Sequence, residues 1–141
     1  MNTESIVIER TYNIPADKVW QALTDVEKIN QWFFQLPDFK AQVGFAFSFS
    51  GKDNGVRVVH ESVIKEVIPG KKLAYSMIYQ DHPQESLVTF ELFDEGDKTR
   101  LLFTHSGLEE MAKGSPLFAR EKFLGGWTYL TDKLSTFLNN Q

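Results

Sequence analysis

The stretch that decides the fold is IVIERTYNIPADKVWQALTDVEKINQWFF, which runs from Ile6 to Phe34. Its first residues alternate, so that Ile6, Ile8 and Tyr12 share one face while polar side chains occupy most of the other. This period of two predicts a strand with one buried face. The pattern stops at Pro15, whose fixed φ and missing N–H suit the start of a helix.

Two short helices are expected after this strand. The first carries apolar side chains at helical spacing, at Val19, Trp20 and Leu23. Asp25 then suits the cap of a second helix. The apolar side chains of the second helix are Ile29, Trp32 and Phe33. A strand that leads directly into two short helices is an uncommon opening, so it narrows the choice of folds.

The chain after residue 34 is almost entirely of the strand type. We expect strands over residues 45–49, 56–68, 73–79, 87–93 and 99–105. Residues typical of turns separate them, at 51–55, 69–70, 80–85 and 94–97. The alternation of the second of these strands is interrupted near His60–Ser62, which predicts a bulge or a bend there. Consecutive strands joined by short turns predict an antiparallel meander.

A long helix is predicted at the end of the chain. Its apolar stripe steps by three and four residues, through Phe123, Trp127, Leu130, Leu134 and Phe137. Gly125 and Gly126 interrupt this helix, at a cost of about 1 kcal/mol for each glycine. We expect the glycine pair to permit a kink or a close approach to the sheet.

These elements predict a single domain over residues 1–141. A sheet of about six antiparallel strands has an apolar face that another element must cover. The C-terminal helix is the element long enough to do so, and the two short helices can close one end. The predicted fold class is therefore α+β, with a curved antiparallel sheet wrapped around the long helix and a cavity between them.

The composition excludes several classes of function. A net charge of −4, with no dense run of Lys and Arg, argues against nucleic acid as a partner. No apolar run approaches the ~20 residues of a membrane span and the N-terminus lacks a signal-peptide pattern, so we expect a cytoplasmic protein. There is no cysteine for a disulfide or a zinc site. His60, His82 and His105 lack ligand spacing, so neither a metal nor another cofactor is expected.

Four segments, in this order, resemble a known family: IERTYNIPADKVWQALTDVEKINQWF, VIKEVIPGKKLAYSM, VTFELFDEGDKTRLLFTHSGLE and GGWTYLTDKLSTFL. They are similar to the START/birch-allergen-like helix-grip (SRPBCC) superfamily and, within it, to bacterial relatives of the activator of heat-shock protein 90 ATPase. The resemblance implies a helix-grip fold. Members include ligand carriers, enzymes, antibiotic-sequestering proteins and co-chaperone domains. The eukaryotic activator has an additional N-terminal domain with no counterpart in this sequence, which weighs against stimulation of a chaperone ATPase.

Inward-facing side chains are the candidates to touch a ligand, and twelve Phe, four Tyr and three Trp supply much apolar area for the purpose. The candidate set combines aromatic residues with a few others: Arg10, Trp32, Phe33, Phe45, Phe47, Phe49, Tyr75, Met77, Phe90, Phe103, His105, Phe123 and Trp127. Each aromatic member of this set either packs in the hydrophobic core or lines the wall of a cavity.

Four of these candidates have two alternative roles each. His105 is either a polar or acid/base group at the cavity mouth or, as we favour, a histidine bonded to nearby backbone. Arg10 either clamps an anionic ligand or, as we favour, pairs with a carboxylate of a neighbouring strand or snorkels to the rim. Trp32 either stacks on a flat ligand or closes the core, together with Phe33. The Tyr75 hydroxyl either orients a ligand or bonds to backbone.

The leading hypothesis is that the protein binds a small, largely apolar molecule, aromatic or lipid-like, without catalysis. The first alternative is an enzyme of the polyketide cyclase or dehydratase type, which uses His105, Arg10 or Tyr75 as acid/base or oxyanion stabiliser. The second alternative is a co-chaperone-like domain that stimulates a heat-shock protein 90-type ATPase. That role requires an exposed apolar or charged patch on the outer face of the sheet.

Overall fold

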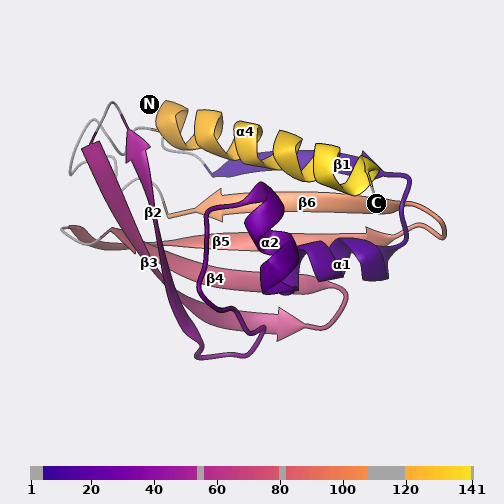
Figure 1. Cartoon of the computed structure of the whole chain (residues 1–141), viewed down its shortest axis with the longest axis horizontal. Helices are drawn as coiled ribbons and strands as arrows, with labels where there is room; N and C mark the ends of the chain where they lie inside the picture. Colours follow the sequence, from indigo (N-terminus) through magenta and orange to yellow (C-terminus); the bar gives the residue numbers. More distant parts are fainter. Residues whose placement is uncertain (1–4, 54–55, 80–81, 108–119, 141) are drawn as a thin grey trace.

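The computed structural model describes residues 5–53, 56–79, 82–107 and 120–140 (Figure 1). In chain order the elements are β1 (Ile6–Tyr12), α1 (Ala16–Thr24), α2 (Val26–Trp32), β2 (Ala46–Asp53), β3 (Val56–Ile68), β4 (Lys72–Tyr79), β5 (His82–Asp94), β6 (Thr99–Ser106) and α4 (Arg120–Asn139). Within these ranges the strands form one six-stranded antiparallel sheet in the order β1-β6-β5-β4-β3-β2. The predicted α+β helix-grip fold is confirmed.

The helices of the described chain cover one face of the curved sheet. α4 runs along β1 and β6, while α1 and α2 lie in front of β4 and β5 (Figure 1). Inward-facing side chains from the sheet and from these helices form one hydrophobic core between the two layers. The small apolar pocket and the buried histidines described below lie on this face of the sheet.

The opening of the chain folds as its sequence predicts. Pro15 is extended and directly precedes α1. Asp25 caps α2, because its carboxylate accepts a hydrogen bond of 3.0 Å from the backbone N–H of Glu27. The indole N–H of Trp32 donates to the backbone oxygen of Ala22 at 2.9 Å. This bond fixes α2 against α1 and gives the buried Trp32 its polar partner.

Of the bulge or bend predicted near His60–Ser62, the bulge is not found there. Pairing of β3 with β2 is continuous there, and the register with β4 shifts between Ile64 and Glu66 instead. His60 and Ser62 are both buried on the inner face, in step with Ile64. Inward and outward side chains alternate regularly along this part of β3. The sequence pattern looked interrupted only because two of the inward side chains are polar.

Two predicted turns are shorter than the sequence suggests. Residues 51–53 belong to β2, where Gly51 pairs with Val58, and residues 82–85 belong to β5. Pairing with a neighbouring strand outweighs the turn preference of Gly, Asp and Pro at these positions. The remaining residues of the two turns, 54–55 and 80–81, lie outside the described residues.

The long helix α4 buries one stripe of side chains against the sheet. Its fully or largely buried members are Phe123, Trp127, Leu130, Leu134 and Leu138, whereas Phe137 is half-buried. Polar contacts add to this packing at β1. Arg10 lies 3.3 Å from the carboxylate of Asp132, and the Ser135 hydroxyl donates to the Tyr12 hydroxyl at 3.4 Å.

The close approach predicted for Gly125 and Gly126 is wrong. Both glycines are exposed, and no atom lies within 4 Å of the position that a Cβ would take. The absence of a side chain therefore serves no packing purpose at these two sites.

Replacing Gly125 or Gly126 by Ala is expected to stabilise the fold by about 0.5–1 kcal/mol each, because Ala restricts the unfolded chain and favours the helix. Chemical denaturation measures the change. Gly70→Ala is the matched control, since Gly70 also has open space around it but has a φ of +76°, and it should destabilise. Equal effects at the three positions would contradict this explanation.

Candidate ligand-binding site

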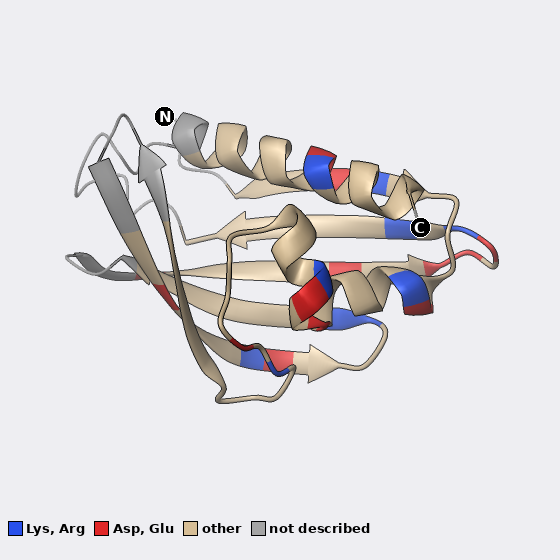
Figure 2. Ribbon diagram, in the orientation of Figure 1, with Lys and Arg blue, Asp and Glu red and all other residues tan. Residues whose placement is uncertain are grey.

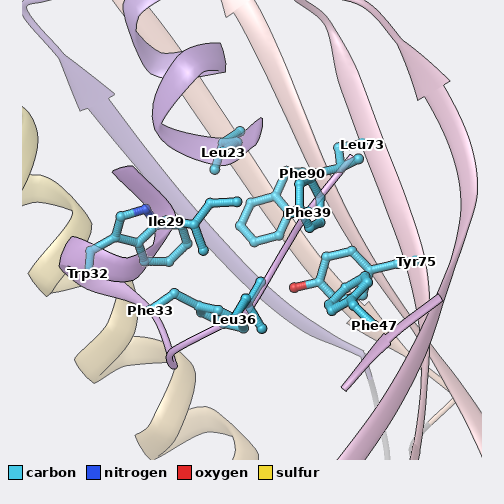
Figure 3. A pocket seen from close by; sticks show the side chains of 10 residues that line it. All are labelled: Leu23, Ile29, Trp32, Phe33, Leu36, Phe39, Phe47, Leu73, Tyr75 and Phe90. Atoms are coloured by element: carbon cyan, nitrogen blue, oxygen red, sulfur yellow. The ribbon is translucent and has the colours of Figure 1, made fainter. Parts of the chain in front are cut away.

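A small apolar pocket lies on the inner face, between the short helices and the middle of the sheet (Figure 3). Its volume is about 20 Å³. The side chains around it come from both helices, from the connection after α2 and from three strands: Leu23, Ile29, Trp32, Phe33, Leu36, Phe39, Phe47, Leu73, Tyr75 and Phe90. A volume of this size holds about one water molecule. The pocket is thus closed around very little space.

Strand alternation supplies the floor of this pocket. Leu73 and Tyr75 both face inward from β4, and Leu73 pairs with Phe90 of β5. Phe47 reaches the same place from β2, and its ring meets that of Tyr75 edge-on with 5.1 Å between centroids. Edge-on packing of this kind is favourable between aromatic rings. The floor is therefore a well-packed aromatic surface.

The roof is formed by the connection between α2 and β2, residues 33–45, which we call the covering segment. Asn30 holds it at one end, because its side chain both donates to the backbone oxygen of Leu36 and accepts from the Leu36 N–H, at 3.0 and 2.8 Å. At the other end, the backbone N–H of Gly44 donates to Ile64 at 2.9 Å. Phe39 lies between these two attachments and points down onto the pocket.

The hydroxyl of Tyr75 is the polar group that this pocket leaves without a partner. Tyr75 is only 4% exposed, and its oxygen points toward the middle of the lining side chains in Figure 3. Within the described part of the chain no group forms a hydrogen bond with it, although this hydroxyl is not fully enclosed, unlike that of Ser62. Burial raises the pKa of Tyr75, so the hydroxyl keeps its proton. The backbone bond that we considered for this tyrosine is not formed.

A second group of inward-facing side chains surrounds His105, closer to the start of α4. The rings of Phe103 and Trp127 lie 4.4 Å apart, and the His105 ring meets that of Phe123 edge-on at 5.1 Å. His105 itself is completely buried. The polar atoms of this group are therefore enclosed by aromatic rings.

Hydrogen bonds determine which nitrogen of His105 carries the proton. The indole N–H of Trp127 can only donate, and it points at Nδ1 of His105 from 3.0 Å. Nδ1 must accept, so the proton of the neutral ring is on Nε2, which lies 2.8 Å from the Ser86 hydroxyl. Ser86 in turn donates to the backbone oxygen of Met77 at 3.3 Å. His105 thus donates to Ser86 and cannot act as the base that would activate it.

The two buried histidines lie near one another on the inner face. Burial lowers the pKa of His105 to about 3, and the charge of a protonated His60 would lower it further. Burial likewise lowers the pKa of His60 to about 4, against a smaller opposite effect of its hydrogen bond with the Phe49 backbone. The His60 ring stacks on Phe49 with 4.5 Å between centroids. Both histidines are therefore neutral at pH 7.

Charge is absent from the pocket lining that the structure describes. All ten lining residues are uncharged, and Figure 2 shows Lys, Arg, Asp and Glu mainly on the helices, near strand ends and in connections. Among the described residues no cluster of His, Asp and Glu can hold a metal ion. Within the same residues, no helix is both long and apolar enough to cross a membrane.

The structure divides the residues that the sequence singled out. Those that line the pocket are Trp32, Phe33, Phe47, Tyr75 and Phe90. Those that belong to the group around His105 are Phe103, His105, Phe123 and Trp127, whereas Phe49 packs against Phe33 and His60. Phe45 packs beside Phe39 and Phe47, and Met77 is buried where its backbone oxygen accepts from Ser86. Whether any of them touches a ligand stays a prediction.

Arg10 and His105 have partners other than those expected. Arg10 pairs with Asp132 of α4 rather than with a neighbouring strand, and the two side chains are 33% and 64% exposed. A pair this exposed contributes little to stability. His105 bonds to two side chains instead of backbone. Asp132 lies 122 residues from Arg10, and Ser86 and Trp127 lie 19 and 22 residues from His105, so sequence spacing gave no sign of these partners.

Sequence reasoning missed the roof of the pocket. Leu36 and Phe39 lie in a connection without helix or strand periodicity, so no pattern marked them as buried. The available signal was the presence of two large apolar side chains in a polar stretch, QLPDFKAQ, residues 35–42. His60 was missed as an inner-face residue for the related reason that its polarity hid the strand alternation.

The two neutral histidines predict how stability depends on pH. The unfolded chain takes up a proton at each histidine near pH 6.5, whereas the folded chain does so only near pH 4 at His60 and pH 3 at His105. Stability is therefore full above pH 6.5 and falls as the pH drops, by about 1.4 kcal/mol per pH unit for each histidine.

Denaturation at a series of pH values between 6.5 and 4.5 measures this slope. His105→Gln keeps an acceptor for Trp127 but does not titrate, so it should remove about half of the slope. A slope equal to that of the unmodified protein would show that His105 is already protonated, or already exposed, in the folded state.

Comparisons with known proteins agree with the fold. Residues 13–139 match the sequence family described as Activator of Hsp90 ATPase homolog 1-like protein. No curated protein matches the chain significantly. The crystal structure of CalU16 from Micromonospora echinospora is 30% identical, with a TM-score of 0.75 and an alignment that covers 95% of this chain and 75% of that one.

Two further solved structures are similar. MLL2253 from Mesorhizobium loti is 30% identical, with a TM-score of 0.77, over 97% of this chain and 98% of that one. DynU16, described as a putative protein in the dynemicin biosynthetic locus, is 21% identical, with a TM-score of 0.76, over 96% of this chain and 47% of that one. At that identity DynU16 shows likeness of fold alone. The family match covers nearly the whole sequence, and the chain therefore belongs to the Activator of Hsp90 ATPase homolog 1-like family.

Proposed function

We propose that the protein binds a small, largely apolar and aromatic molecule in the pocket beneath the covering segment. The observation that carries this proposal is the Tyr75 hydroxyl, which is buried among apolar side chains and has no hydrogen-bond partner in the described chain. A hydrogen bond to this hydroxyl contributes about 0.5–1.5 kcal/mol net. A ligand acceptor can supply that bond, and ligand pockets commonly combine apolar walls with a few such polar groups.

The polar groups around His105 do not provide an equivalent site. Each of them is already paired: Trp127 with His105, His105 with Ser86, and Ser86 with Met77. A ligand that bonded to one of these groups would have to break an existing hydrogen bond. Of these two places, only the pocket near Tyr75 has a side-chain donor that forms no hydrogen bond within the described chain.

A ligand must displace part of the roof, since the pocket volume is only about 20 Å³. An apolar cavity that binds benzene has a volume of about 150 Å³. Phe39 is the side chain best placed to move, because it lies on the covering segment between the attachments at Leu36 and Gly44. When Phe39 swings outward, an aromatic ligand can take the place of its ring against Phe47, with which Phe39 now packs at 5.2 Å.

The relatives are compatible with a role in binding small molecules. DynU16 belongs, by its description, to a biosynthetic locus, and CalU16 shares 30% of its sequence with this chain. The enzyme alternative loses its best candidate base, since His105 donates its proton to Ser86. For the chaperone alternative, the exposed large apolar side chains of the described chain are scattered over six positions: Val7, Val43, Ile68, Leu87, Phe93 and Tyr129.

Titration with naphthalene, followed by amide chemical shifts, tests the proposal. We expect the largest changes at Leu36, Phe39 and Tyr75, which surround the pocket. Phe39→Ala should bind naphthalene more tightly, because no ring has to be displaced, and should lower the free energy of unfolding by about 3 kcal/mol.

Phe93→Ala is the matched control for this experiment. Phe93 lies on the outer face of β5 beneath Arg100, so its removal leaves the pocket unchanged. Binding to the unmodified protein that shifts only residues outside the pocket, or no gain in affinity for Phe39→Ala over Phe93→Ala, would contradict the proposed site.

A further inference from the structure

We infer that the pocket is selective for an uncharged aromatic molecule that carries a hydrogen-bond acceptor, such as a carbonyl oxygen, and that Tyr75 is the residue that selects it. This inference rests on the proposed function and adds the chemical class of the ligand. Three features of the described residues support it. Tyr75 has a hydroxyl hydrogen that bonds to no described residue, the side chains around it are uncharged, and the charged or titratable groups nearby do not compensate a buried negative charge.

The first feature is the direction of the missing hydrogen bond. A tyrosine hydroxyl has one hydrogen to donate, and no described residue accepts the hydrogen of Tyr75. Burial keeps the pKa of this hydroxyl above its usual value, so the hydrogen is present at pH 7. The complementary ligand atom is therefore an acceptor.

The second feature is that nothing in the pocket stabilises a negative charge. The lining side chains are all uncharged, and the lining indole N–H of Trp32 already donates to Ala22. Arg10 pairs with Asp132 at α4. Moving a carboxylate from water into such a pocket without a cation is strongly unfavourable. A neutral carbonyl of the same size carries no such penalty and still accepts from Tyr75.

The third feature is the state of the other charged and titratable groups nearby. Asp38 and Lys40 flank Phe39 on the covering segment, but both are exposed to solvent. A ligand carboxylate that stayed outside the pocket would lie near the negative charge of Asp38 and the positive charge of Lys40, so the two electrostatic effects would oppose each other. His60 and His105 are neutral and belong to the other end of the inner face. None of these groups offsets the burial of an anion next to Tyr75.

Three naphthalene derivatives of similar size test the inference: 2-acetylnaphthalene, 2-ethylnaphthalene and 2-naphthoate. Their dissociation constants are measured by amide shifts at pH 7.5, where the histidines are neutral. We expect the ketone to bind about three- to tenfold more tightly than the ethyl compound, which is the usual net effect of one hydrogen bond. The naphthoate should bind at least about a hundredfold more weakly than the ketone.

Tyr75→Phe isolates the hydroxyl. It should abolish the preference for the ketone by weakening ketone binding alone, and it should leave 2-ethylnaphthalene unaffected. Because this hydroxyl has no protein partner, we expect the variant to be at least as stable as the parent. Ser62→Ala is the matched control: Ser62 also has a buried hydroxyl without a described partner, but it does not line the pocket. It should leave all three dissociation constants unchanged.

The measurements distinguish failure of this inference from failure of the proposed function, which is ligand binding in the pocket. If none of the three compounds shifts the pocket residues, both the proposed function and the inference fail. If all three bind at the pocket with equal affinity, or 2-naphthoate binds best, the pocket is a ligand site and the inference fails. If Ser62→Ala abolishes the ketone preference as fully as Tyr75→Phe, then Tyr75 is not the selecting residue.

Discussion

The hydrogen bond from the indole of Trp127 to Nδ1 of His105 gives a specific direction to the packing of α4 against the middle of the sheet. Aromatic packing alone is poorly directional, so rings can slide or rotate with small changes in free energy. A buried N–H that loses its acceptor costs about 1–3 kcal/mol. The bond to His105 therefore favours one position of α4 along the sheet and one rotation of α4 about its own axis. It is continued through Ser86 to the Met77 backbone, so one chain of hydrogen bonds joins α4 to β6, β5 and β4.

The inner face contains two kinds of polar group. Those around His105 satisfy one another completely, and their role is to fix the fold. Ser62 has a fully enclosed hydroxyl without a partner among the described residues, and the hydroxyl of Tyr75, a residue only 4% exposed, forms no hydrogen bond there either. Native proteins leave few such groups, and each one calls for a reason. For Tyr75 the neighbouring pocket offers a reason, namely a ligand, whereas Ser62 lies beside Phe47 without lining the pocket.

The sequence was sufficient for the fold because local periodicity and side-chain type act over short distances. The alternation in β1, the caps at Pro15 and Asp25 and the stripe on α4 all involve residues within a few positions of one another. The site was harder to predict. Phe39 belongs to an irregular connection, and the partners of Arg10 and His105 are fixed by tertiary packing. Whether an inward aromatic ring is core or pocket wall depends on the space left around it, which residue identity does not determine.

The sheet topology also affects the order in which the molecule can form. β1 is the first strand of the chain, yet its one neighbour is β6, so that Ile8 pairs with Phe103. Its polar contacts with α4 join residues still farther apart, Arg10 and Asp132. Contacts between such distant positions close long loops and slow folding. During synthesis the N-terminal strand must wait, with its apolar face exposed, until almost the whole chain has emerged. β1 is therefore synthesised first but pairs late. The protein is most prone to aggregate between the synthesis of β1 and its pairing with β6.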